Sequence, residues 1–127
     1  MSRSNTLQVL LVPVAGAVEA RTIPHTLEAM QGLVGGLLER VTLSSRKGRT
    51  TLLYVNEEGI GLGLPVNSRL TQAFGVPLLE QPLHGPGFIC AVTGPEWETV
   101  SLSDEEIAAW SRMLFLLGDD RLREVPS

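Results

Sequence analysis

Cysteine, lysine and aromatic side chains are all scarce in this sequence of 127 residues. The one cysteine, Cys90, cannot form an intramolecular disulfide, and no Cys/His spacing typical of a zinc site is present. Aromatic residues make up 5% of the chain, which disfavours the base-stacking surfaces that bind single-stranded nucleic acid. No apolar run approaches the roughly 20 residues of a transmembrane helix. These absences exclude a disulfide scaffold and disfavour a membrane-spanning protein.

Charge is also modest, with a formal net charge of −4 and 19% charged residues. A general nucleic-acid-binding protein would carry an excess of basic residues, so this class is disfavoured. The start of the chain lacks the apolar block and cleavage site of a signal peptide, which favours a cytoplasmic protein. The Gly-x-Gly at 61–63 lacks the third glycine of a dinucleotide site. We expect no cofactor and no membrane contact, while a homo-oligomer stays open.

The hydrophobic content, at 43%, is ample for a folded core. Domains commonly hold about 100–150 residues, so the length indicates one domain. We predict a single α+β domain over residues 1–127. Its ordered core spans about 7–118, and a polar C-terminal tail follows at 119–127.

Hydrophobic periodicity predicts the elements of the first half of this domain. Two apolar or alternating segments, at 7–14 and 18–23, predict an N-terminal β-hairpin. Apolar residues at helical spacing predict a long helix over 26–41. The pair Gly35-Gly36 interrupts that helix and indicates either close backbone packing or an early helix end.

The second half contains further strands and two capped helices. Apolar runs at 51–55 and 87–93 predict strands that join the hairpin in one mixed sheet. Asn67 is placed to cap a short helix, and Ser103 begins the capping box of a C-terminal amphipathic helix. Loops are predicted at 44–50 and 76–87. The order β-β-α-β-α-β-α favours the α+β class over a doubly wound parallel sheet.

A polar cluster within residues 54–69 is the candidate binding surface. It combines two amides, two adjacent carboxylates and a guanidinium, namely Asn56, Glu57, Glu58, Asn67 and Arg69. The amides and the arginine can donate hydrogen bonds to a protein partner or small ligand, and the carboxylates can accept them. Two alternatives stay open: the segment is a charged turn fastened by its arginine, or the carboxylates serve as acid and base or hold a cation such as magnesium. No catalytic residue and no metal ligand is assigned.

The glycine that follows the two carboxylates, Gly59, is expected to adopt a positive φ. A β-branched side chain is strained in that conformation. We therefore expect Gly59→Val to destabilise the fold.

The same segment carries a resemblance to a known family. It reads Tyr-x-Asn-Glu-Glu-Gly and then Gly-Leu-Pro-x-Asn-x-Arg, carried by Tyr54, Asn56, Glu57, Glu58, Gly59, Gly63, Leu64, Pro65, Asn67 and Arg69. With this motif the sequence resembles the domain of unknown function 3846 family, over about residues 7–117. It departs from that pattern at Val66, where a second proline is common, and in a Pro/Gly-rich insertion before Gly87. The resemblance implies a small accessory protein of bacteria, plasmids or phages, without an established activity.

These observations support one leading hypothesis and two alternatives. The leading hypothesis is a small cytoplasmic accessory or binding protein, associated with a mobile element, that acts through the surface around residues 54–69. The first alternative is a metal-assisted hydrolase that uses Glu57 or Glu58. Whether the protein is an enzyme therefore stays open, and the sequence favours a protein without catalytic activity. The second is an acidic protein that mimics nucleic acid. Such a mimic needs many carboxylates on one face, and a net charge of −4 is small for it.

Overall fold

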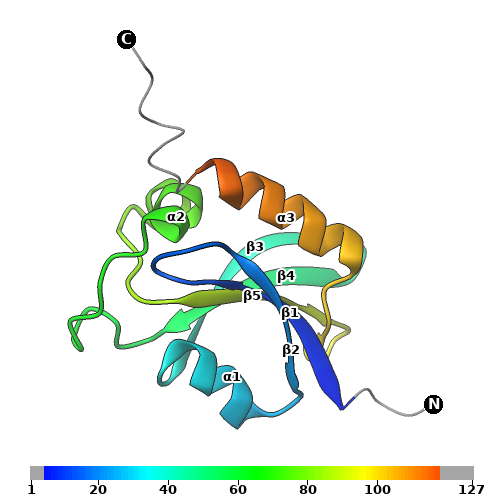
Figure 1. Cartoon of the computed structure of the whole chain (residues 1–127). Coiled ribbons are helices and arrows are strands. Elements are labelled where there is room, and N and C mark those ends of the chain that lie inside the picture. Colours follow the sequence, from blue (N-terminus) through cyan, green and yellow to red (C-terminus); the bar gives the residue numbers. More distant parts are fainter. Residues whose placement is uncertain (1–4, 118–127) are drawn as a thin grey trace.

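One six-stranded sheet lies at the centre of the molecule, between helices (Figure 1). The computed structural model describes residues 5–117. The strands are β1 (Thr6–Val12), β2 (Glu19–Pro24), β3 (Leu38–Arg46), β4 (Arg49–Asn56), β5 (Gly87–Thr93) and β6 (Glu98–Val100). The helices are α1 (Leu27–Val34), α2 (Ser68–Leu70), the π-helix η1 (Thr71–Leu79) and α3 (Asp104–Leu116). No helix within the described residues is long and apolar enough to cross a membrane.

The strand order is β2-β1-β5-β4-β3, and β6 also pairs with β5. Every pairing is antiparallel, so the α+β class is confirmed, whereas the prediction of a mixed sheet is wrong. The predicted N-terminal hairpin is confirmed as the pair β1–β2. Strand β1 pairs with residues 87–89 of β5 and β6 with residues 91–93, so both occupy successive parts of β5.

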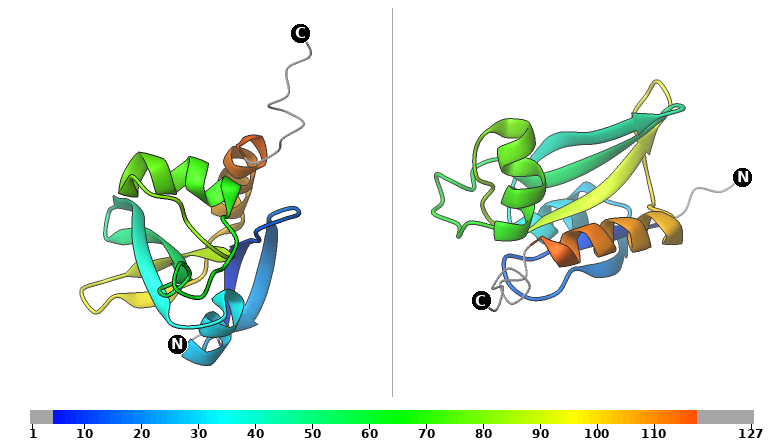
Figure 2. Two further views of the ribbon diagram at one scale, coloured as in Figure 1. Left: turned by 90° about the vertical axis from the view of Figure 1, so that its left-hand side faces the viewer. Right: turned by 90° about the horizontal axis from the view of Figure 1, so that it is seen from above.

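Alternate residues of the central strands form two separate cores, one on each face of the sheet. Helix α1 packs on the face that carries Leu7, Val9, Leu11, Leu52, Tyr54, Phe88, Cys90 and Val92. Helices α2, η1 and α3 cover the face that carries Leu10, Val12, Val41, Leu53, Val55, Ile89 and Ala91. Figure 2 shows the helices on the two sides of the sheet from two further directions. A sheet that is covered on both faces needs apolar residues at successive positions, which explains the continuous apolar runs of β4 and β5.

Helix α1 ends at Val34, so the predicted long helix over 26–41 is wrong in its second half. Gly35 adopts the left-handed conformation (φ 80°), and its N–H donates to the carbonyl of Gln31 at 2.8 Å. A Cβ at Gly36 would lie 2.9 Å from Nδ2 of Asn56, so this glycine allows a close approach. Both suggested roles of the glycine pair are therefore present, and the chain turns into β3.

The basic segment 44–50, predicted as a loop, contains strand ends and a tight turn instead. Lys47 and Gly48 both have positive φ, which suits the right-handed twist of a β-hairpin. The turn is followed by Arg49, whose guanidinium donates to the Glu106 carboxylate at 2.6 and 3.1 Å and to the carbonyl of Ser101 at 2.8 Å. This ion pair joins the β3–β4 hairpin to the first turn of α3.

The C-terminal helix begins as predicted. Ser103 and Glu106 form both hydrogen bonds of the capping box. The predicted loop 76–87 begins inside η1, which continues to Leu79. The polar tail at 119–127 lies outside the described residues.

Cys90 is a core thiol, as expected. Its Sγ donates to the carbonyl of Val100 at 3.0 Å, and burial raises the pKa of the thiol to about 11. The thiolate, which is the reactive form, is therefore negligible at neutral pH.

Glu106→Gln tests the ion pair between the hairpin and α3. The hydrogen bond from Arg49 is the main cause that lowers the pKa of Glu106 below its usual range. The ion pair therefore stabilises the fold above the unfolded carboxyl pKa, and its contribution is lost as the pH falls through the lower folded pKa. Glutamine keeps an acceptor for the capping box. We expect urea unfolding to show a loss of about 1 kcal/mol at neutral pH, because solvent screens this partly exposed pair.

The difference between Glu106→Gln and the wild type should disappear below the folded pKa of the carboxyl group. Equal stability of the two proteins at neutral pH would contradict this account of the ion pair.

Candidate binding site

Asn56, at the end of β4, connects the following turn to the end of α1. Its Oδ1 accepts a hydrogen bond from the N–H of Glu58 at 2.7 Å, and its Nδ2 donates to the carbonyl of Val34 at 3.1 Å. The side chain is buried. An asparagine that bonds the backbone two residues on makes the chain turn, so the sequence Asn-Glu-Glu-Gly forms the turn expected of it.

Asn67 is fully buried and joins three segments. Its Oδ1 accepts from the N–H of Leu70 at 3.0 Å, which confirms that it caps α2. Its Nδ2 donates to the carbonyls of Val12 and Gly85, both at 3.1 Å. An amide nitrogen has two hydrogens, so both donors are used inside the protein.

Arg69 fastens the connection between β1 and β2. Its Nη1 donates to the carbonyl of Gly16 at 2.7 Å, and its Nε is buried without a hydrogen-bond partner. Arg69 therefore fastens the β1–β2 connection and not the turn that carries Glu57 and Glu58, so the alternative of a charged turn fastened by its own arginine is wrong in its partner.

Glu57 and Glu58 are both exposed, in the turn after β4. Within residues 5–117, neither carboxylate accepts a hydrogen bond or forms an ion pair. Of the five predicted site residues, the structure brings Asn56 and Glu57 to one pocket, whereas Glu58 is not among its lining residues. A direct contact of all five with a partner stays a prediction.

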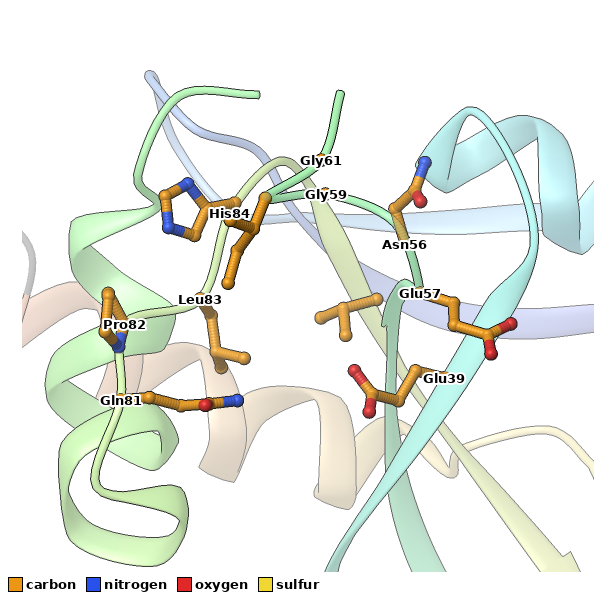
Figure 3. Close-up of a pocket in the computed structure, with 11 residues that line it drawn as sticks. Glu39, Asn56, Glu57, Gly59, Gly61, Gln81, Pro82, Leu83 and His84 are labelled. Carbon is orange, nitrogen blue, oxygen red and sulfur yellow. The ribbon is translucent and has the colours of Figure 1, made fainter. Parts of the chain in front are cut away.

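The pocket lies between the 56–61 turn and residues 81–84 and has a volume of about 190 Å³. Val55 and Leu83 contribute apolar surface. Figure 3 shows the side chains of Glu39 and Gln81 pointing toward one another from opposite sides of the pocket. The carboxylate of Glu57 points away from this space.

His84 belongs to residues 81–84, which form the side of the pocket opposite the 56–61 turn. Its imidazole points away from the pocket (Figure 3). Its Nδ1 lies 2.8 Å from the carbonyl oxygen of Leu64, so this nitrogen carries the proton and donates it. The N–H of Gly85 donates to the carbonyl of Pro65 at 2.7 Å. These bonds tie the loop after β4 to the segment before β5.

Glu39 and Gln81 line the pocket but are not among the residues that the sequence predicts for the site. The predicted helix over 26–41 includes Glu39, although this residue lies in β3 and pairs with Val55 of β4. The pair Gly35-Gly36 is the signal in the sequence, because a helix end at this pair places Glu39 in a strand. Gln81 follows η1 in a segment that the sequence predicts to be irregular, and no sequence pattern marks it.

No group of three or more His, Cys, Asp or Glu side chains in residues 5–117 is arranged to hold a metal ion. The hydrolase alternative requires Glu57 and Glu58 to face one pocket, and only Glu57 lines the pocket. The observed arrangement therefore adds no support to metal-assisted hydrolysis.

Together, these features define a small α+β domain with an antiparallel sheet between helices and a polar pocket beside the 56–61 turn. The family described as Domain of unknown function (DUF3846) matches residues 7–115. The chain belongs to this family, which confirms the predicted resemblance to it. No curated protein and no solved structure matches the chain.

Gly59→Val tests how closely the 56–61 turn packs against residues 81–84. The expected positive φ of Gly59 is wrong, since the glycine is not among the residues in that conformation. A Cβ at Gly59 would instead lie 3.0 Å from the carbonyl oxygen of His84. We expect valine to reduce the free energy of unfolding by about 2 kcal/mol through overpacking, measured by urea unfolding.

Gly61→Val is the matched control, because the nearest atom to its Cβ would be 3.7 Å away, an ordinary contact. Its effect should stay within about 0.5 kcal/mol. Equal effects of the two valines would show that contact with His84 is not the cause.

Asn67→Ala tests the hydrogen bonds by which Asn67 connects the end of β1, the start of α2 and the segment before β5. It removes the helix cap and leaves two carbonyl oxygens without their donor, so we expect a loss of about 3 kcal/mol in urea unfolding. The neighbouring Ser68→Ala, at an exposed position, should change stability by less than about 0.5 kcal/mol. A mild effect of Asn67→Ala would show that the three bonds contribute little.

Proposed function

We propose that this chain is a small accessory protein that binds its partner at the pocket between Glu39 and Gln81. The proposal rests on the observation that both side chains point into the pocket, where Val55 and Leu83 add apolar surface (Figure 3). Neither side chain forms a hydrogen bond or ion pair with another side chain among the residues that the structure describes. A carboxylate and a carboxamide in this position are available to a ligand.

The chemistry of the two side chains favours a positively charged hydrogen-bond donor. The Glu39 carboxylate accepts hydrogen bonds and carries a negative charge, and the Gln81 carbonyl accepts as well. Charge-assisted hydrogen bonds are about twice as strong as neutral ones. An ammonium or guanidinium group satisfies both acceptors, while its alkyl stem can lie against Val55 and Leu83.

The size of the pocket favours a side chain of a protein partner over a large ligand. A volume of about 190 Å³ is below the roughly 300–1,000 Å³ of pockets for drug-sized molecules. The adjoining loop also exposes apolar side chains, with Ile60 66% and Leu62 59% exposed. Exposed apolar residues beside a polar pocket are typical of interaction surfaces.

A cytoplasmic location and an association with a mobile element are further parts of the proposal. Both rest on the sequence and on the family resemblance. The pocket itself bears on neither of them.

Glu39→Gln tests the proposal with N-acetyl-arginine amide as a probe of the pocket. We expect saturable shifts of the backbone amides of Glu39, Gln81 and Leu83 in ¹⁵N-labelled protein. Glutamine has the same shape without the charge, so binding should weaken about tenfold, which corresponds to about 1.4 kcal/mol. N-acetyl-citrulline amide, a neutral analogue of the probe, should bind the wild type similarly weakly.

Glu105→Gln removes an exposed carboxylate of α3 and serves as the control. It should bind the arginine probe as the wild type does. The proposal is wrong if the wild type shows no saturable shifts at the pocket, or if Glu39→Gln and Glu105→Gln bind equally.

A further inference from the structure

A second pocket lies on the opposite face of the sheet, beside α1. It has a volume of about 410 Å³, within the range of pockets for small molecules. Its apolar lining comes from Leu27, Met30 and Leu38. Arg40 also lines it, because neighbouring residues of β3 point to opposite faces and Glu39 points to the first pocket.

Arg40 is the charged group of this second pocket. Its guanidinium carbon lies 5.0 Å from the centroid of the Trp97 ring. In the described part of the chain, residues 5–117, no carboxylate pairs with it and no acceptor receives its hydrogen bonds. A guanidinium that lies over an aromatic ring can still donate hydrogen bonds to an anion through its N–H groups.

Trp97 adopts a backbone conformation that is unusual for a large side chain. Its φ is 54°, in the left-handed region where glycine is normally found. The residue is 48% exposed, so burial in the core does not explain its presence. Its observed contact is with the guanidinium of Arg40, which lies over the ring.

Tyr54 provides a second polar group at the same pocket. Its ring stacks on Phe88 with the centroids 5.0 Å apart, and the side chain is buried. Burial raises the pKa of the hydroxyl group, although the nearby charge of Arg40 and the neighbouring Thr99 lower it in part. The hydroxyl is therefore protonated at neutral pH.

We propose that this pocket binds a small amphipathic carboxylate, with its charged group on Arg40 and its apolar body against Leu27, Met30 and Leu38. One guanidinium matches one planar carboxylate, which it can bind through two parallel hydrogen bonds. This site is separate from the pocket at Glu39, and neither proposal depends on the other.

The test uses 4-phenylbutyrate as the probe and ¹⁵N-labelled protein. We expect saturable shifts of the amides of Leu27, Leu38 and Arg40, and weak or absent shifts with the neutral 4-phenylbutyramide. Arg40→Gln should weaken binding of the acid about tenfold. Arg46→Gln, which changes an exposed arginine of the same strand, should bind as the wild type does.

Trp97→Gly distinguishes a role in binding from a role in the fold. Glycine relieves the strained φ, so thermal stability should stay equal or rise, while binding of 4-phenylbutyrate weakens because Arg40 loses its support. The proposal is overturned if acid and amide bind equally, if Arg40→Gln binds as tightly as Arg46→Gln, or if the shifts concentrate at Ile60 and Leu62 instead.

Discussion

The fold depends on one buried amide, the side chain of Asn67. It bonds a residue 55 positions earlier, at the end of β1, and one 18 positions later, just before β5, while it caps α2. A buried amide is costly unless its hydrogen bonds are made, so the three segments must meet at this point. Their meeting brings residues 81–84 beside the turn after β4. The pocket at Glu39 follows from this constraint.

The second organising feature is the pair of opposite charges at the start of β3. Glu39 and Arg40 are adjacent in sequence and line pockets on opposite faces of the sheet. Neither has a partner of opposite charge within residues 5–117. Three residues of the candidate surface in segment 54–69 are used differently, since Asn56, Asn67 and Arg69 bond the protein's own backbone. The segment 54–69 thus builds the first pocket, and β3 supplies the charge on either side of the sheet.

Local patterns predicted the elements that local interactions decide. The hairpin β1–β2, the cap at Asn67, the capping box at Ser103 and the buried Cys90 all follow from neighbouring residues. The region after α1 could not be predicted in this way, because Met30, Val34 and Val41 fit a helical spacing although Val41 lies in a strand. The helix ends at Gly35, and the chain then passes close to Asn56, a residue 20 positions beyond Gly36. That long-range contact decides where Glu39 lies, and the pair Gly35-Gly36 is the one local signal in the sequence that points to it.

Native-state hydrogen exchange of the Leu70 amide tests most directly whether the fold depends on the hydrogen bonds of Asn67. This N–H donates to Oδ1 of Asn67. If the three bonds open only when the whole protein unfolds, Leu70 should exchange with the same free energy as Ile89 in the central strand β5. Exchange at a clearly lower free energy would show that these bonds open locally, and would contradict the dependence of the fold on Asn67.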